Sequence, residues 1–120
     1  MLKKFILTVL LLLTTASAAP HPKIDLWFIY RNGCPACMQM EAKLRQPNIV
    51  AILKRSYRIH RVERSNQDTL PKLFMHTHTF PTLYFLDAQG EAIVDPIHNV
   101  SSKELLRVMR EAEILSEENF

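Results

Sequence analysis

Apolar positions along the chain change their spacing several times, and each change marks a predicted element. The run Ile24–Tyr30 is nearly continuous in apolar residues, which is typical of a central strand covered on both faces. From Pro35 the apolar residues take helical spacing, and Pro47 should kink or restart this helix, which continues over residues 48–57. Residues 58–63 alternate basic with apolar side chains, a pattern that predicts a second strand at a sheet edge.

The second half of the chain predicts two further helices and a hairpin. Residues 70–75 have a short helical pattern, and Thr82–Leu86 is an apolar run of strand length. A turn sequence at residues 87–90 leads into residues 91–95, which predict a fourth strand paired with the third. A capping box that begins at Ser101 opens the last helix. The predicted order is β-α-β-α-β-β-α, which makes this an α/β chain.

The N-terminal segment indicates an export signal and not a part of the fold. Lys3 and Lys4 give a positive start, residues 5–13 are an apolar core, and the small residues that end at Ala18 match a signal-peptidase site. The alternative is a retained membrane anchor, which the shortness of the apolar run disfavours. We therefore expect a signal peptide that is cleaved after Ala18, followed by a single domain over residues 19–120.

The charge balance does not favour a nucleic-acid partner. The formal net charge is +3 for the whole chain, and removal of Lys3 and Lys4 lowers it to +1. Basic residues nevertheless gather in one stretch, where only Glu63 opposes them. This basic group is either a solvated helix and strand edge or a docking face for an acidic partner or anionic lipid. Its members are Lys43, Arg45, Lys54, Arg55, Arg58, Arg61 and Arg64.

The only two cysteines occur as Cys34-Pro35-Ala36-Cys37, directly after the first predicted strand and a turn. Cysteines at this spacing in the first turn of a helix have side chains close enough to join as a disulfide. Unpaired N–H groups and the macrodipole favour a thiolate on Cys34, and Pro35 suits the first helical position. A loop this short constrains the unfolded chain little, so a structural staple is a poor explanation. We expect Cys34 to be the exposed attacking sulfur and Cys37 the resolving one.

Histidines near Pro81 leave other interpretations open. His76 and His78 lie shortly before this proline, so they could approach the dithiol and tune it. Together with the two cysteines they also make four possible zinc ligands, although the His-x-His spacing differs from that of common zinc sites. Exposed loop histidines without such a role are the remaining alternative.

The cysteine motif and the order of elements together resemble the thioredoxin-like superfamily. The motif follows the first strand, and Phe80-Pro81-Thr82 opens the third, where the family carries a cis-proline that faces the dithiol. The hairpin sequence at residues 84–91 is similar as well. The resemblance covers the chain beyond the signal segment and implies a trimmed thioredoxin-like fold with a four-stranded mixed sheet flanked by helices. It also implies that Phe80, Pro81 and Thr82 contact an extended substrate.

Two departures from the family pattern bear on the chemistry. Cytosolic members carry a buried acid six residues before the first cysteine, where this chain has Phe28. The proton acceptor for Cys37 therefore stays open between Glu41 and water. The intervening residues Pro35 and Ala36 match neither the typical reductant pair nor the strong-oxidant pair, and they predict an intermediate potential.

The resemblance implies a small periplasmic thiol-disulfide oxidoreductase. Its redox group would be the Cys34–Cys37 disulfide itself, so we expect no other cofactor and no metal. The expected partners are exported proteins that contain cysteines and a membrane-bound redox partner, with no nucleic acid, and the protein is expected to be a monomer. The direction of exchange stays open. The alternative is a binding module without turnover, either thioredoxin-like or metal-carrying through cysteine and histidine.

Overall fold

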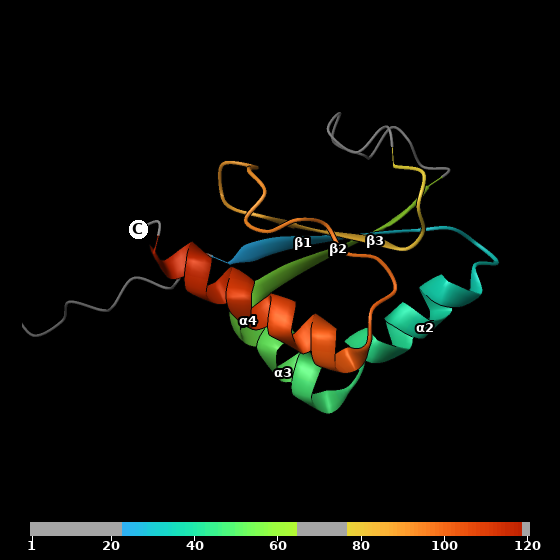
Figure 1. Ribbon diagram of the computed structural model, residues 1–120, viewed down its shortest axis with the longest axis horizontal. Helices are drawn as coiled ribbons and strands as arrows, with labels where there is room; N and C mark the ends of the chain where they lie inside the picture. Colours follow the sequence, from blue (N-terminus) through green and yellow to red (C-terminus); the bar gives the residue numbers. More distant parts are fainter. Residues whose placement is uncertain (1–22, 65–76, 119–120) are drawn as a thin grey trace, which may run out of the picture.

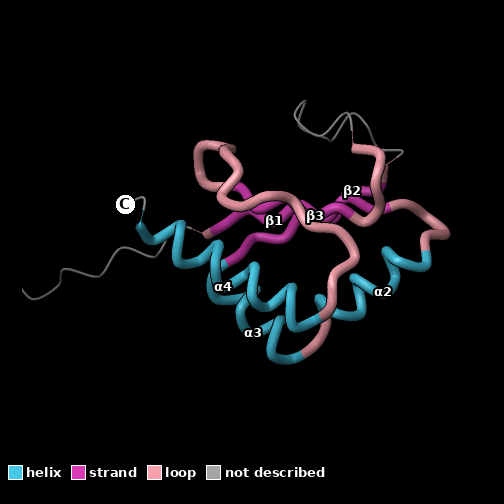
Figure 2. Tube along the Cα trace, in the orientation of Figure 1, coloured by secondary structure: helices cyan, strands magenta, loops and turns pink. Residues whose placement is uncertain are grey.

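The computed structural model describes residues 23–64 and 77–118, which form a sheet with helices packed against one of its faces (Figure 1). Figure 2 shows the same layers by element type, with the helices together on one side of the strands. The elements in chain order are β1 (Ile24–Tyr30), α2 (Pro35–Leu44), α3 (Pro47–Ser56), β2 (Tyr57–Glu63), β3 (Thr82–Leu86) and α4 (Ser102–Glu118).

Within the described residues, β1 is the central strand of a three-stranded sheet with the order β2-β1-β3. It pairs in parallel with β2, so that Leu26 lies opposite Ile59, and antiparallel with β3, so that Leu26 also lies opposite Phe85. A parallel neighbour requires a crossover connection, and α2 and α3 supply it on one face of the sheet. The predictions of a central first strand and of a second strand at an edge are confirmed.

Alternation of the β1 side chains explains why this strand is buried on both faces. Ile24, Leu26 and Phe28 belong to the main hydrophobic core on the helix side. Ile29 points the other way and belongs to a smaller cluster on the opposite side of the sheet. A strand with apolar residues at successive positions therefore has a buried place for nearly all of them.

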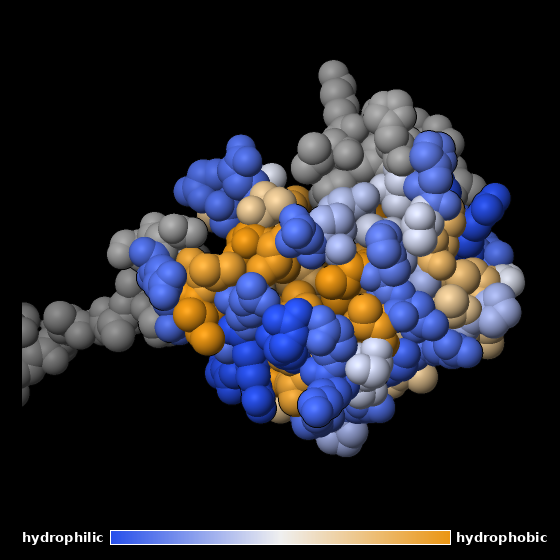
Figure 3. Space-filling view, in the orientation of Figure 1, coloured by the Kyte–Doolittle hydropathy of each residue, from blue (hydrophilic) through white to orange (hydrophobic). Residues whose placement is uncertain are grey.

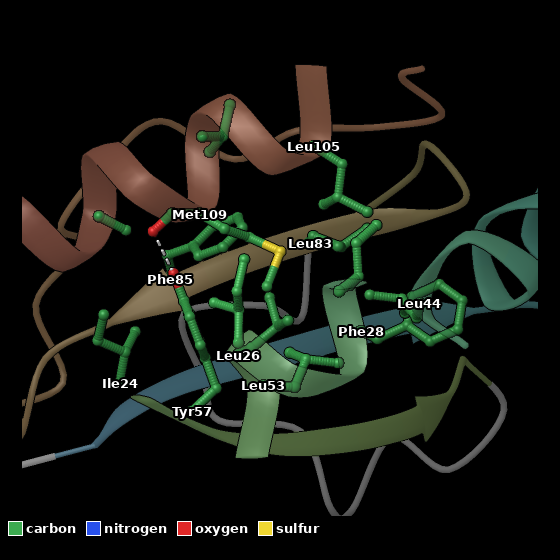
Figure 4. Packing of buried hydrophobic residues seen from close by; sticks show 14 of the residues in the cluster. Ile24, Leu26, Phe28, Leu44, Leu53, Tyr57, Leu83, Phe85, Leu105 and Met109 are labelled. Atoms are coloured by element: carbon green, nitrogen blue, oxygen red, sulfur yellow. Dashed lines mark hydrogen bonds between the residues drawn. The ribbon is translucent and has the colours of Figure 1, made fainter. Parts of the chain in front are cut away.

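The main core lies between the sheet and the helices (Figure 4). Leu26 and Phe85 of the strands share this core with Met109 of α4, and all three side chains are fully buried. Tyr57, at the start of β2, donates a hydrogen bond of 2.6 Å from its hydroxyl to the Met109 carbonyl. Burial raises the pKa of the Tyr57 hydroxyl, and the nearby carboxylate of Glu113 adds to this effect.

The helical segment after the cysteine motif is interrupted before Pro47, as its sequence predicts. α2 ends at Leu44, where the N–H of Arg45 donates to the Ala42 carbonyl and the N–H of Gln46 donates to the Lys43 carbonyl. Pro47 then opens α3, where its missing N–H would have had no helical partner. The predicted restart at this proline is confirmed.

The sequence places the boundary between α3 and β2 one residue too late. It predicts a helix through Tyr57, but α3 ends at Ser56, and Tyr57 has the extended dihedrals φ −127° and ψ 149°. In this position the tyrosine ring is buried and its hydroxyl reaches α4. The tertiary contact decides the conformation, and the local spacing contains no sign of it.

Residues 87–90 form the predicted turn after β3. A side-chain oxygen of Asp87 accepts hydrogen bonds of 2.9 Å from the N–H groups of Gln89 and Glu91. The Asp87 carbonyl accepts a third, of 3.0 Å, from the N–H of Gly90. Gly90 has a φ of +80°, in the left-handed region that glycine adopts without a Cβ penalty.

The predicted fourth strand over residues 91–95 is wrong for the described chain, and with it the four-stranded sheet. After the turn, the chain meets β3 only at two isolated bridges, Ala92 with Leu86 and Ile97 with Leu83. The returning chain has two more residues between these bridges than β3 has, so a regular ladder cannot continue from one bridge to the other. The proline before Ile97 also lacks an N–H for pairing.

α4 begins as the capping box predicts. The Ser101 hydroxyl accepts a hydrogen bond of 3.1 Å from the N–H of Glu104, and the Ser101 carbonyl accepts one of 2.9 Å from the N–H of Leu105. The buried residues of the helix are Leu105, Val108, Met109 and Ala112. Figure 3 shows that the face of the molecule on which α4 lies mixes hydrophilic and hydrophobic residues.

The opposite face of the sheet carries a smaller cluster with polar edges. Its buried members are Ile29, Val62 and Leu86. The ring of Trp27 packs against this cluster and stacks on the ring of His60, with centroids 4.3 Å apart. His60 Nε2 lies 2.9 Å from a carboxylate oxygen of Asp25, which also pairs with Arg58 at 3.1 Å. Residues of β1 and β2 are therefore joined on this face by both stacking and charge.

Two sequence predictions fall outside the described residues. These are the signal segment over residues 1–18 and the short helix over residues 70–75. Across residues 23–64 and 77–118, no helix has the length and apolar character that crossing a membrane requires. The domain boundary at residue 19 stays a prediction.

Candidate active site

A tight turn after β1 places the cysteine motif at the start of α2. β1 ends at Tyr30, and Gly33 has a φ of +73°. A Cβ atom on Gly33 would meet no other atom within 4 Å, so glycine is required here by its backbone conformation and not by space. The turn places Cys34 at the N-terminal end of α2.

Cys34 is the N-cap residue of α2. Its Sγ accepts a hydrogen bond of 3.1 Å from the N–H of Cys37, and its carbonyl accepts one of 3.1 Å from the N–H of Met38. Pro35 occupies the first helical turn, as predicted, and that turn contains no acidic residue. The hydrogen bond from the Cys37 N–H and the positive end of the helix macrodipole therefore both favour negative charge on the Cys34 sulfur.

Cys34 and Cys37 form a disulfide, and their Cα atoms are 5.2 Å apart. This separation lies within the usual range for disulfides. Cys37 is only 4% exposed, whereas Cys34 is partly exposed. The expected difference in exposure between the two sulfurs is therefore confirmed, while the attacking role of Cys34 and the resolving role of Cys37 stay predictions.

The segment before β3 lies against the disulfide. The peptide bond between Phe80 and Pro81 is cis, and the Phe80 carbonyl oxygen lies 3.9 Å from Cys34 Sγ. Phe80 is partly exposed, while Pro81 and Thr82 are buried. The Thr82 hydroxyl is used inside the protein, where it donates to the Thr79 carbonyl. Of the three residues predicted to contact substrate, Phe80 is the one that is partly exposed.

His98 contacts this segment, a role that the sequence did not reveal. Its Nδ1 lies 3.2 Å from the Pro81 carbonyl oxygen and 3.1 Å from the Thr82 hydroxyl oxygen. The bridge between Leu83 and Ile97 brings His98 to this position. Because the contact to Pro81 spans 17 positions of sequence, no local spacing could have found it. The predicted hairpin, which brings the returning chain beside β3, was the one sequence signal that could have placed His98 near this segment.

The residues after His98 connect the same loop to the helix that carries the cysteines. The Asn99 side chain donates to Gln39 Oε1 at 2.9 Å and accepts from Lys43 Nζ at 3.0 Å. Lys43 also donates to the Val100 carbonyl at 2.7 Å. Because Gln39 and Lys43 belong to α2, the loop ties the dithiol helix to the cis-proline segment.

The residues expected to tune the dithiol lie in different surroundings. Pro35 is exposed and Ala36 is half-buried, both in the first turn of α2. His78 is exposed, and among the described residues it makes no hydrogen bond to either sulfur. It lines a cavity beside Phe80 instead. A tuning role for these residues stays a prediction.

No carboxylate of the described chain is hydrogen-bonded to Cys37. Phe28, at the position where cytosolic members of the resembled family carry an acid, is 2% exposed and lies in the main core. Glu41 forms ion pairs of 3.0 Å with both Arg45 and Arg61. Its carboxylate is therefore engaged in ion pairs on the surface of α2, and the identity of the proton acceptor for Cys37 stays a prediction.

The described residues give the zinc alternative no complete ligand set. The described residues contain no group of three or more His, Cys, Asp or Glu side chains that could hold a metal ion. Cys34 and Cys37 are joined to each other, and His76 lies outside the described residues. His78 therefore has no described partner set with which it could bind a metal.

Much of the basic group is paired within the protein, which favours its interpretation as a solvated surface. Arg55 pairs with Glu113 of α4 at 3.3 Å, and Arg58 pairs with Asp25 of β1 at 3.1 Å. Two more arginines share Glu41, as described above. These pairs are exposed and contribute little stability, but they offset the positive charge that a docking face would need.

No family model and no curated protein sequence matches the chain. Among solved structures, a thioredoxin from Thermus thermophilus matches with a TM-score of 0.64 and 19% identity, covering 78% of this chain and 76% of its own. A DsbH oxidoreductase matches with a TM-score of 0.64 and 17% identity over 77% of this chain and 74% of its own. A thioredoxin-fold protein from Helicobacter pylori matches with a TM-score of 0.63 and 18% identity, over 78% and 70% respectively.

Sequence identities this low establish a shared fold and not a shared activity. In this chain the fold consists of a central strand with one parallel and one antiparallel neighbour, helices on one face of the sheet, and a disulfide at the start of α2. The expected superfamily resemblance is confirmed at the level of architecture, with three strands among the described residues in place of the four expected. The chain adopts a thioredoxin-like fold.

Proposed function

We propose that this protein is a thiol-disulfide oxidoreductase that exchanges disulfides with other proteins through Cys34 and Cys37. The observation that carries the proposal is a disulfide at a helix N-terminus with one sulfur partly exposed and the other buried. Such a pair can receive a sulfur at Cys34 and complete the exchange from Cys37. The fold supports the proposal, because its structural neighbours include a thioredoxin and a DsbH oxidoreductase.

In the reductive direction, the Cys34 thiolate attacks one sulfur of a substrate disulfide. A mixed disulfide forms, and the other substrate sulfur leaves as a thiolate and takes up a proton. Cys37 then loses its proton to water, attacks Cys34 Sγ and releases the second substrate thiol. Two electrons pass to the substrate, and the Cys34–Cys37 disulfide of the structure is the product state.

In the oxidative direction, a substrate thiolate attacks Cys34 Sγ of the disulfide and Cys37 leaves as a thiolate. A second substrate thiolate then attacks the substrate sulfur of the mixed disulfide and releases Cys34. The leaving Cys34 thiolate is favoured by the Cys37 N–H and the helix end. The same contacts thus serve both directions, and the reduction potential decides between them.

The segment around Pro81 is proposed to hold the substrate chain. The Phe80 carbonyl faces Cys34 at 3.9 Å, so a backbone N–H next to the reacting substrate cysteine can donate to it. Binding through main-chain atoms gives affinity with little dependence on sequence. Additional selectivity would have to come from side chains around this segment.

Location and partners belong to the same proposal. The export signal expected over residues 1–18 supports a periplasmic enzyme that acts on exported proteins containing cysteines. A membrane-bound partner would reset the dithiol, and neither nucleic acid nor a second copy of the chain is required. The Cys34–Cys37 pair donates two electrons as a dithiol or accepts two as a disulfide, so the reaction needs no additional cofactor.

Cysteine variants test the proposal directly. Cys34→Ser should lose all exchange with a protein disulfide, because the accessible sulfur is gone. Cys37→Ser should accumulate a mixed disulfide between Cys34 and the substrate, visible on non-reducing gels and by mass spectrometry. Circular dichroism of both variants controls for folding. Retained exchange in both variants would contradict the proposal, and zinc held tightly by the reduced protein would favour the metal-binding alternative.

The reduction potential then sets the direction. Equilibration with glutathione redox buffers should give a value between about −270 mV, typical of thioredoxin, and about −120 mV, typical of a strong oxidant. A value near the lower limit would identify a reductant fed by a membrane donor. One near the upper limit would identify an oxidant that donates disulfides to exported chains.

A further inference from the structure

A cavity of about 480 Å³ lies beside the dithiol segment, between the turn after β1 and the segment before β3. Its lining includes Arg31, Asn32, Glu63, Arg64, His78 and Phe80. Apart from Phe80, none of these side chains has a part in the exchange reaction described above. The cavity is large enough to accept an amino-acid side chain.

The described part of the cavity lining is positively charged on balance. Arg31 and Arg64 bring two permanent positive charges, and Glu63 brings one negative charge. Arg31 is exposed, and it makes no ion pair with any described residue. Arg64 is fixed in the wall through the bond of 3.3 Å from its Nε to the Thr77 carbonyl. Two guanidinium groups therefore border a space that an anion can enter.

Phe80 joins the cavity to the reacting sulfur. Its carbonyl oxygen lies 3.9 Å from Cys34 Sγ, and its ring lies under the guanidinium of Arg31, 5.4 Å from the ring centroid. Arg31 and Asn32 also precede Cys34 closely in the chain. A substrate cysteine that reacts at Cys34 therefore has its neighbouring residues within a few ångströms of this cavity, since successive Cα atoms are about 3.8 Å apart.

We propose that this cavity is a subsite for an acidic side chain that flanks the reacting cysteine of the substrate. The proposal rests on the thiol-disulfide exchange proposed above and adds the class of substrate: proteins whose redox-active cysteine has an Asp or Glu beside it. The carboxylate accepts charge-assisted hydrogen bonds from the exposed Arg31 and from the less exposed Arg64. The main-chain contacts at Phe80 align the substrate, and the cavity selects among the aligned chains.

Matched peptide disulfides test the subsite. Three peptides that differ only in the residue next to the cysteine, which is Glu, Gln or Lys, are offered to the reduced full-length protein. The ratio of kcat/KM for the Glu peptide to that for the Gln peptide should be about five at low ionic strength and fall as salt is added. The Lys peptide should be the slowest. Both flanking positions of the cysteine are tested, since the chain direction of the bound peptide is not assumed.

Arginine variants attribute the preference to the cavity. Arg31→Gln should bring the Glu-to-Gln ratio close to one, and Arg31→Glu should make the Lys peptide faster than the Glu peptide. Arg110→Gln, at an exposed position of α4 away from the cavity, is the matched control and should leave the wild-type ratio unchanged. Using a ratio between peptides removes any general effect of Arg31 on the Phe80 ring.

The outcomes separate the two proposals. Wild-type protein that exchanges with all three peptides at one rate, or an Arg110→Gln effect equal to that of Arg31→Gln, overturns the subsite and leaves the oxidoreductase proposal intact. Wild-type protein that exchanges with none of the peptides, and with no protein disulfide, overturns the oxidoreductase proposal beneath it.

Discussion

Gly33 is the residue whose backbone conformation delivers Cys34 to the helix end. Its φ of +73° lies in the left-handed region, and the space around it is open. Gly90, in the turn that follows β3, also has a positive φ and open space around it. The two glycines therefore form a natural pair for separating a cost in stability from a cost in catalysis.

We expect Gly33→Ala to lower the free energy of unfolding by about 1–2 kcal/mol, because alanine resists the left-handed conformation. It should also slow thiol-disulfide exchange, because relief of that conformation shifts Cys34. Urea unfolding followed through Trp27, the only tryptophan, and an exchange assay measure the two effects. Gly90→Ala should show a similar loss of stability at full exchange rate. Equal exchange rates in the two variants would show that Gly33 does not position the dithiol.

Tyr57 gives a prediction for alkaline pH. Burial raises its pKa in the folded protein, whereas in the unfolded chain it ionises near the ordinary value of about 10. Above that pH the unfolded state holds fewer protons than the folded state, so the stability contributed by Tyr57 is complete below about pH 10 and is lost as pH rises further. The loss should approach about 1.4 kcal/mol per pH unit.

Tyr57→Phe tests this contribution. At neutral pH the variant should be about 1 kcal/mol less stable, since it loses the hydrogen bond to the Met109 carbonyl. Above pH 10 its stability should fall less steeply than that of the wild type. Urea unfolding at a series of pH values compares them, and two parallel curves would contradict the assignment.

Residue types and their spacing indicated the residues of the candidate site, but not the residues that hold them in position. Cys34, Cys37 and the Phe80–Pro81 pair were found because each belongs to a short motif with a local meaning. His98 was missed because its contacts depend on how the chain returns after β3, which no short motif encodes. Residues that position others across a fold have no sequence signature of their own.

At the scale of elements, the loop over residues 98–100 determines how α2 and the cis-proline segment sit together. His98 contacts the Pro81 carbonyl, and Asn99 contacts Gln39 and Lys43 on α2. The loop is therefore a support for the site, and not only a connection from β3 to α4.

We expect His98→Ala to raise KM for a protein disulfide several-fold, because the segment that holds the substrate chain loses a support. The reduction potential should change little, since His98 makes no hydrogen bond to either sulfur among the described residues. Steady-state kinetics and redox equilibration measure the two quantities separately. Gln89→Ala, in the exposed turn after β3, is the control. A shifted potential with an unchanged KM would contradict this role.

Most elements were predictable because their apolar spacing agrees with their final environment. β1, β3 and the capped start of α4 follow this rule. The fourth strand failed because residues 91–95 have suitable local composition but the wrong chain length between the two bridges to β3. Strand pairing depends on register between distant residues, and alternation within one segment does not specify that register.

Over the whole molecule, β1 separates two apolar regions of unequal size. Leu26 faces the main core and Ile29 faces the smaller cluster, and neither side chain is exposed to solvent. The continuous apolar run of β1 indicated burial on both faces from the sequence alone, and the structure confirms it. The predicted number of strands, in contrast, rested on the hairpin after β3, and no continuous apolar run like that of β1 specified it.

We expect Leu26→Ala and Ile29→Ala each to lower the free energy of unfolding by about 2–5 kcal/mol, because each leaves a cavity in a packed region. Met38→Ala, at a side chain that is 70% exposed, should change it by less than about 0.5 kcal/mol. Urea unfolding measures all three variants. A mild effect of Ile29→Ala beside a severe effect of Leu26→Ala would show that the second face contributes little to stability.

Figure 1 places the start of α2, with Cys34 just before it, and the C-terminal end of α4 at opposite ends of the molecule. An affinity matrix coupled beyond Glu118 would therefore hold the protein with its reactive sulfur turned toward the solution. Loaded in this way, Cys37→Ser would capture from a cell extract any protein that forms a mixed disulfide with Cys34. Elution with a reductant would release only the proteins that had been joined to it through sulfur.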